Sequence, residues 1–168
     1  LDKLNWINNQ YIKQADTKRL TELLIPLLKA RKYLAEGFDR NWLEKVVQLF
    51  QPRLNTLNDF CDWADFLFLE KPRFTAEAKG KLVGKSLRDA FKLLLERIDK
   101  LETFDLQSTE ATFRDLVKEL NLSASDLVHP TRAALTGKTI GPGLFETMVI
   151  LGKEKTAERL KQAVKLIK

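Results

Sequence analysis

The residues with the clearest chemical potential lie in one glycine-containing stretch, ALTGKTIGPGLFE, from Ala134 to Glu146. Its Gly137-Lys138-Thr139 is similar to the end of a nucleotide-binding P-loop, whose backbone N–H groups surround the phosphates. That motif also requires an earlier glycine, but Arg132 stands in its place, and no hydrophobic strand comes before it. The spacing therefore argues against a P-loop and favours a turn between two helices.

Few other residues could carry out catalysis or hold a metal ion. The only cysteine, Cys61, lies near Phe60 and Trp63, and the only histidine, His129, has no sequence link to it. We therefore expect a buried, unreactive thiol, no disulfide, and neither a Cys–His nucleophile nor a zinc site. No carboxylate pair or nucleophile triad is visible either, so we predict no catalytic residue, no metal and no cofactor in this chain.

The composition indicates a basic globular protein. The 168 residues are 44% hydrophobic and 31% charged, with a net charge of +6, which is enough for one domain or two small ones. A basic balance favours an anionic partner, with nucleic acid first, although the signal alone is weak. There is no long apolar run and no signal-peptide pattern, so we expect no membrane partner and a location in the cytoplasm, or in an organelle after processing.

Apolar residues recur at steps of three and four along nearly the whole chain, and strand signals are almost absent. The pattern predicts an all-α protein of nine or ten short helices. The expected helices cover 20–28, 41–50, 57–69, 76–81, 85–102, 110–120, 124–136, 144–151 and 153–168.

Polar caps and prolines predict where several helices begin and end. Asp16 is a plausible N-cap of the first predicted helix, in which Pro26 should cause a kink or a break. Ser108 or Thr109 should cap the helix at 110–120. Ser123 with Asp126 fits a capping box for a helix that runs through Pro130, or restarts there, and ends at Gly137.

The segment Glu70-Lys-Pro-Arg-Phe74 is the best candidate for a boundary between two parts of the chain. We therefore expect two small helical subdomains, covering residues 1–71 and 72–168.

Four motifs follow one another in order along the chain. They are Lys3-Leu-Asn-Trp6-Ile-Asn8 with Tyr11-Ile12, then Pro52-Arg53-Leu-Asn-Thr56-Leu57, then Arg132-Ala-Ala-Leu-Thr-Gly137 with Gly141-Pro-Gly-Leu-Phe-Glu146, and last Leu151-Gly-Lys-Glu-Lys-Thr156 with Glu158-Arg-Leu160. Together they closely resemble the C-terminal, anticodon-binding region of bacterial-type glutamyl-tRNA synthetases, which are class I enzymes. In that family the region forms two all-helical subdomains, as the boundary near Pro72 also indicates.

The resemblance implies a function in tRNA recognition without chemistry in this chain. The HIGH and KMSKS signatures, which handle ATP in the family's catalytic half, are absent. We expect a monomer that binds the anticodon loop of tRNA(Glu) but does not activate glutamate, with ATP and magnesium belonging to the parent enzyme. The alternative is a helical protein-interaction scaffold that does not bind RNA.

The resemblance implies that Arg53 reads the last anticodon base. This base is cytosine for glutamate and guanine for glutamine, and the family members that do not discriminate lack the arginine. A guanidinium offers paired donors to the two acceptors of cytosine, whereas guanine presents donors at that edge. We therefore expect a discriminating reader. From the residue alone, Arg53 would be a solvated or helix-capping arginine.

Other contacts are implied in the same way. Arg132 matches the arginine that contacts the first anticodon base, and the turn Gly141-Pro142-Gly143-Leu144 matches the loop beside the anticodon, where glycine allows close approach and Leu144 should offer an apolar surface. Lys3 and Trp6 match residues near the inner side of the tRNA, although a tryptophan is by type more often buried.

Lysines supply the last group of expected contacts. Lys138, Lys153 and Lys155 could bind phosphate and add salt-dependent affinity, with a solvated surface as the ordinary alternative.

Overall fold

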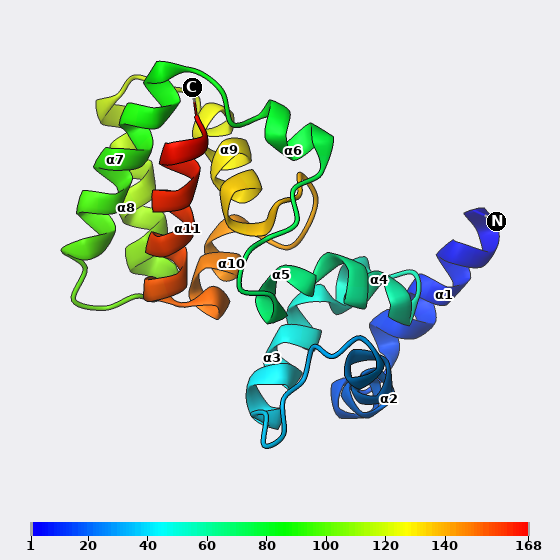
Figure 1. Ribbon diagram of the computed structural model, residues 1–168. Helices are drawn as coiled ribbons and strands as arrows, with labels where there is room; N and C mark the ends of the chain where they lie inside the picture. The colour runs from blue at the N-terminus through cyan, green and yellow to red at the C-terminus, as the bar shows by residue number, and fades with distance from the viewer. Residues whose placement is uncertain (1, 168) are drawn as a thin grey trace. The chain divides into compact units, whose positions relative to one another are not determined.

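The computed structural model describes residues 2–167, which form eleven α-helices, one 3₁₀ turn and no strand (Figure 1). The prediction of an all-α protein is thus confirmed. The helices are α1 (Asp2–Gln14), α2 (Thr17–Ala30), α3 (Arg40–Phe50), α4 (Leu57–Trp63), α5 (Asp65–Phe68), α6 (Ala76–Gly80), α7 (Lys85–Asp99), α8 (Leu106–Glu119), α9 (Ala124–Thr136), α10 (Leu144–Leu151) and α11 (Lys153–Leu166), and the 3₁₀ turn η1 covers Gln51–Arg53.

The contacts between residues divide the chain into two compact units. The first unit comprises the described residues up to Glu70 together with Ile140–Pro142, and the second comprises Lys71–Thr139 and the described residues from Gly143 onward. The predicted subdomains differ from these units, because they include residue 71 in the first subdomain and residues 140–142 in the second. Periodicity could not detect that a short loop of the later sequence packs with the earlier unit.

The core of the first unit forms where α2 packs against α3 and α4. Phe50 of α3 and Phe60 of α4 are fully buried and meet edge to face, with ring centroids 5.6 Å apart. Each such side chain contributes about 1.5–3 kcal/mol of hydrophobic stabilisation when it leaves water. The remaining fully buried side chains of this core include Leu24, Leu28, Leu43, Val46, Val47, Leu54 and Cys61.

The second unit is built around α7, which lies beside α11 and α8 (Figure 1). Phe91, Leu94 and Ile98 recur on one face of α7 at helical spacing, and each is at most 1% exposed. Phe113 of α8 and Leu160 of α11 are buried as well.

Most predicted helix ends agree with the structure. The carboxylate of Asp16 accepts a hydrogen bond from the Arg19 N–H at 2.9 Å. Ser123 and Asp126 form the predicted capping box, with each side chain accepting from the other's backbone N–H. Gly137 ends α9 in the left-handed conformation, with φ 72°.

Three predicted boundaries differ from the structure. The cap of α8 is Asp105, and Ser108 is its partner three positions into the helix. The helix predicted at 57–69 is divided at Ala64, where φ −93° and ψ 0° separate α4 from α5. The helix α1 was not predicted at all, because Trp6 and Tyr11 are exposed and its apolar residues mark no buried stripe.

Both prolines inside helices are accommodated without a break. Pro26 lies within α2 and Pro130 within α9. On both sides of Pro26, Leu24 and Leu28 are fully buried, so tertiary packing supports the helix where proline removes one backbone hydrogen bond.

Candidate nucleic-acid interface

Arg53 lies in η1, the single turn that follows α3. Pro52 fixes the backbone there, since proline suits the first position of a helical turn. The side chain of Arg53 is exposed and has no hydrogen bond or ion pair to any residue that the structure describes. Its guanidinium donors therefore remain available for a ligand.

Two side chains hold η1 against α1. The amide of Asn9 donates to the Leu54 carbonyl at 2.7 Å and lies 3.5 Å from the Pro52 carbonyl. The amide of Gln51 donates to the carbonyls of Ile12 at 2.8 Å and Ala15 at 2.9 Å. The backbone on both sides of Arg53 is therefore fixed.

Arg132 lies on α9, within the second unit, and is half-buried. The end of this helix is closely packed: a Cβ on Gly137 would lie 2.2 Å from the Arg73 carbonyl oxygen, and the Thr75 N–H donates to the Gly137 carbonyl at 2.9 Å. Arg159, 2% exposed, donates to the Leu135 carbonyl at 2.5 Å. Sequence reasoning did not assign Arg159 this role, since a helix-capping arginine from a distant segment has no local signal.

Gly137-Lys138-Thr139 comes at the end of a helix rather than at the beginning of one. The Gly137 N–H donates to the Ala133 carbonyl at 2.8 Å, so the carbonyl end of α9 faces this tripeptide. A helix C-terminus carries partial negative charge and disfavours phosphate, whereas a P-loop places phosphate at a helix N-terminus. The donor set here does not fit ATP.

The turn at 141–144, which is predicted to lie beside the anticodon, differs in exposure from the residue that precedes it. Ile140, just before it, is 57% exposed, while Pro142 is buried. Leu144 is only 4% exposed, so the expectation that it offers an apolar surface is wrong: as the first residue of α10 it packs into the core. Any contact at Leu144 would have to use its backbone.

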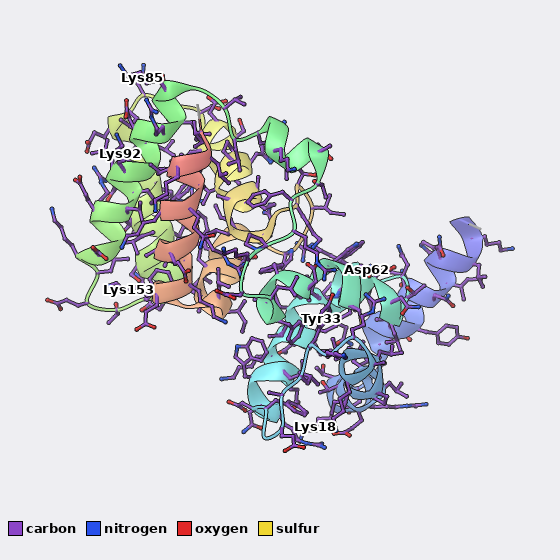
Figure 2. The ribbon with its side chains drawn as sticks, in the orientation of Figure 1. Lys18, Tyr33, Asp62, Lys85, Lys92 and Lys153 are labelled. Carbon is purple, nitrogen blue, oxygen red and sulfur yellow. The ribbon has the colours of Figure 1, made fainter. Side chains whose placement is uncertain are left out.

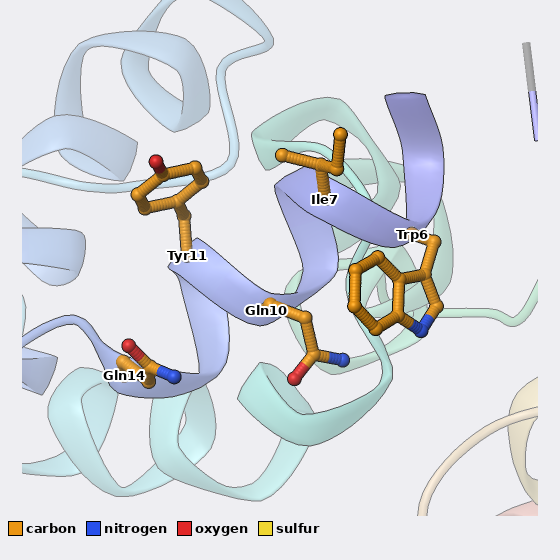
Figure 3. A pocket seen from close by; sticks show the side chains of 5 residues that line it. All are labelled: Trp6, Ile7, Gln10, Tyr11 and Gln14. Carbon is orange, nitrogen blue, oxygen red and sulfur yellow. The ribbon is translucent and has the colours of Figure 1, made fainter. Parts of the chain in front are cut away.

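The amphipathic surface of α1 is more open than its residue types indicate. Trp6 is 64% exposed, so the alternative that it belongs to the core is wrong, and Tyr11 is 73% exposed. Both line a shallow groove of about 410 Å³ together with Ile7, Gln10 and Gln14 (Figure 3). Lys3, on the same helix, is exposed.

The three predicted phosphate contacts of the second unit have different surroundings, and of these Lys155 is exposed. Lys138 is half-buried, and its backbone N–H donates to the Thr136 hydroxyl at 3.1 Å. The ammonium group of Lys153 donates to the carbonyls of Asp99 at 3.0 Å and Leu101 at 2.7 Å, at the end of α7 (Figure 2). It thus satisfies carbonyls at a helix terminus, and one of its three N–H donors remains for another partner.

Cys61 is fully buried, as expected. Burial raises the pKa of its thiol above the ordinary range, with Arg31 partly opposing the shift. Among the described residues no three His, Cys, Asp or Glu side chains come together as they would in a metal site. No described helix is long and apolar enough to cross a membrane.

The positive charge is distributed unequally along the chain. Residues 1–70 contain ten basic and ten acidic side chains, so the whole net charge of +6 resides in residues 71–168. Exposed lysines such as Lys85 and Lys92 lie along α7 (Figure 2). Nonspecific attraction for a polyanion therefore originates mainly in the second unit.

The fold is shared with a known class of helical domains. The crystal structure of a glutamate tRNA ligase from Elizabethkingia meningosepticum matches with a TM-score of 0.82, over 96% of this chain and 31% of that one. The sequences are 21% identical in this match, which establishes the likeness of the fold.

The sequence comparison identifies the family. The anticodon binding domain family matches over residues 19–164, and the chain belongs to this family. It is also 39% identical over 168 residues to glutamate–tRNA ligase 2 of Thermoanaerobacter pseudethanolicus and 38% identical to glutamate–tRNA ligase 1 of Caldanaerobacter subterraneus. The resemblance to glutamyl-tRNA synthetases is thus confirmed. The chain covers 99% of its own length in both matches but 35% of each relative.

Proposed function

We propose that this chain is the anticodon-binding part of a glutamate–tRNA ligase and recognises the anticodon loop of tRNA(Glu), with Arg53 as the residue that excludes tRNA(Gln). The observation that supports this most is the exposed guanidinium of Arg53 on a turn fixed from both sides.

The discrimination follows from hydrogen-bond complementarity. Cytosine has adjoining O2 and N3 acceptors, which two parallel N–H donors of arginine can satisfy. Guanine would direct its own donors at the guanidinium and leave both sides unpaired. Each buried unpaired group costs roughly 1–3 kcal/mol, which is about ten- to a hundredfold in affinity.

Both units supply the remaining contacts in this proposal. In the second unit, Arg132 contacts the first anticodon base, and Lys138 and Lys153 contact phosphates. The backbone at Gly141, Pro142, Gly143 and Leu144, of which the first two residues belong to the first unit, approaches the anticodon loop. Lys3 and Trp6 of the first unit contact the tRNA near the inner side of its stem and anticodon arm. Because the net charge lies in residues 71–168, salt should weaken binding mainly through the second unit.

The chemistry of aminoacylation lies outside this chain in the proposal. The parent enzyme attaches glutamate in an ATP- and magnesium-dependent reaction in the cytoplasm, while this chain acts as a monomer and does not activate glutamate. The tripeptide at 137–139 supports this division, because a helix C-terminus is unsuited to phosphate.

A protein-interaction scaffold is the second candidate. It is supported by apolar side chains on α1 and α2 that remain open: Leu4 is 57% exposed, Tyr11 73% and Leu23 49%.

One titration separates the two candidates. Labelled tRNA(Glu) and tRNA(Gln) transcripts are titrated with the chain at two salt concentrations. Binding that is selective for tRNA(Glu) and weaker at high salt supports anticodon recognition, whereas the absence of binding to either transcript supports the scaffold.

A further inference from the structure

We propose that Asn9 of α1 is a positioning residue for base discrimination, which sets the orientation of Arg53 through the backbone of η1. This inference rests on the proposed reading of the last anticodon base by Arg53. It assigns specificity to a residue of α1 that the motifs of this helix, at Lys3–Asn8 and Tyr11-Ile12, do not include.

The side-chain amide of Asn9 lies close to the backbone carbonyls on both sides of Arg53. Its amide nitrogen lies 2.7 Å from the Leu54 carbonyl, directly after Arg53, and 3.5 Å from the Pro52 carbonyl, directly before it. Asn9 does not contact the Arg53 side chain in any described hydrogen bond. Asn9 can therefore influence the recognition of a base only by fixing the backbone from which the Arg53 side chain extends.

Gln51 makes the link to α1 rigid. Its side chain donates to the carbonyls of Ile12 and Ala15, at the end of α1, and accepts from the Thr17 hydroxyl at 2.9 Å, at the start of α2. The Ile12 carbonyl lies in the last turn of α1, where among the described residues it otherwise accepts only from the Ala15 N–H at 3.3 Å, and Ala15 directly follows the helix. The polar network thus joins α1, the start of α2 and η1.

Few backbone hydrogen bonds hold the two residues that flank Arg53. The Gln51 N–H donates to the Val47 carbonyl, but the Leu54 N–H closes the turn on the Gln51 carbonyl at a long 3.4 Å, and Pro52 donates no backbone hydrogen bond. Because a bidentate contact depends on direction, a displacement of about 1 Å can reduce its contribution by up to about a hundredfold. Asn9 is therefore placed to control selectivity more than affinity.

The test compares three substitutions in the 168-residue chain. Asn9→Asp replaces the amide donor with a carboxylate that faces two carbonyl oxygens. Asn5→Asp adds the same charge to the same helix, at a position whose side chain makes no hydrogen bond with the described part of the chain. Asn9→Leu removes the donor without charge, in case Asn9→Asp does not fold.

The readout is the ratio of the dissociation constants for tRNA(Glu) transcripts that end the anticodon in cytosine or guanine. We expect Asn9→Asp to reduce this ratio about three- to tenfold relative to Asn5→Asp, while both variants bind the cytosine transcript with similar salt dependence. In an Arg53→Gln background, Asn9→Asp should change the ratio no further. An unchanged ratio in the folded variant, or an effect that persists without Arg53, would overturn the positioning role.

A measurement without RNA separates this inference from the proposed function. Hydrogen exchange at the Leu54 amide, followed by NMR, should be about tenfold faster in Asn9→Asp than in Asn5→Asp. Equal exchange would contradict the positioning role even if the wild-type chain discriminates. Equal binding of both transcripts by the wild-type chain would instead refute the reading by Arg53, and the inference with it.

Discussion

Replacing Gln51 by leucine should destabilise the first unit and leave the second intact. Gln51 is 7% exposed, and its amide connects α1, α2 and η1 through the Ile12, Ala15 and Thr17 contacts. Leucine has a similar volume, so the substitution removes the hydrogen bonds without opening a large cavity.

The magnitude follows from the groups that lose their partners. Two carbonyls and one hydroxyl would lose the amide, and each costs about 1–3 kcal/mol when fully buried. Since these bonds are only partly buried, water recovers a share, and we expect a loss of about 2–3 kcal/mol in the free energy of unfolding. For a unit of this size, the melting temperature should fall on the order of 10 °C.

The tryptophans provide an assay that is specific to this unit. All three, Trp6, Trp42 and Trp63, lie in the first unit. Urea denaturation followed by tryptophan fluorescence therefore reports the first unit, while far-UV circular dichroism reports both. The matched control is Gln48→Leu, because Gln48 is exposed on α3. If Gln51→Leu and Gln48→Leu differ by less than about 0.5 kcal/mol, the network does not stabilise the unit and the reasoning is refuted.

Three further outcomes can be measured. Gly137→Ala should destabilise the second unit by about 2–4 kcal/mol in calorimetry, because φ 72° and the Arg73 carbonyl at 2.2 Å leave no room for a Cβ; a loss under about 1 kcal/mol would contradict this. Lys153→Met should cost about 1–2 kcal/mol by circular dichroism and flatten the salt dependence of tRNA binding, whereas the exposed Lys155→Met serves as the stability control. Cys61 has a raised pKa, so the folded state favours the neutral thiol and loses stability as the pH rises through that pKa; alkylation at pH 8 should be much slower than in urea, and equal rates would show that the thiol is accessible.

Local signals allowed much of the fold to be predicted. The recurrence of Leu20, Leu24 and Leu28, the caps at Asp16 and Ser123, and the glycine at 137 each depend on nearby residues, so the sequence alone reveals them. The helix α1 was not predicted, because its exposed Trp6 and Tyr11 do not form a buried apolar stripe that periodicity could detect.

The candidate site was accessible from the sequence only in part. Motif resemblance located Arg53 and Arg132, of which the structure shows Arg53 exposed and Arg132 half-buried. Exposure could not be derived in this way, as Leu144 demonstrates by packing into the core. The supporting residues Asn9, Gln51 and Arg159 act on backbone carbonyls more than 20 positions away, and no local pattern encodes such a pairing.

The most direct test of the account is the effect of Arg53→Gln on two tRNA(Glu) transcripts that differ only in the last anticodon base. The wild-type chain should bind the cytosine transcript about ten- to a hundredfold more tightly than the guanine transcript. Arg53→Gln should bring the two affinities close together and lower overall binding less. Equal affinities for the wild-type chain, or a preference that survives Arg53→Gln unchanged, would contradict the central claim.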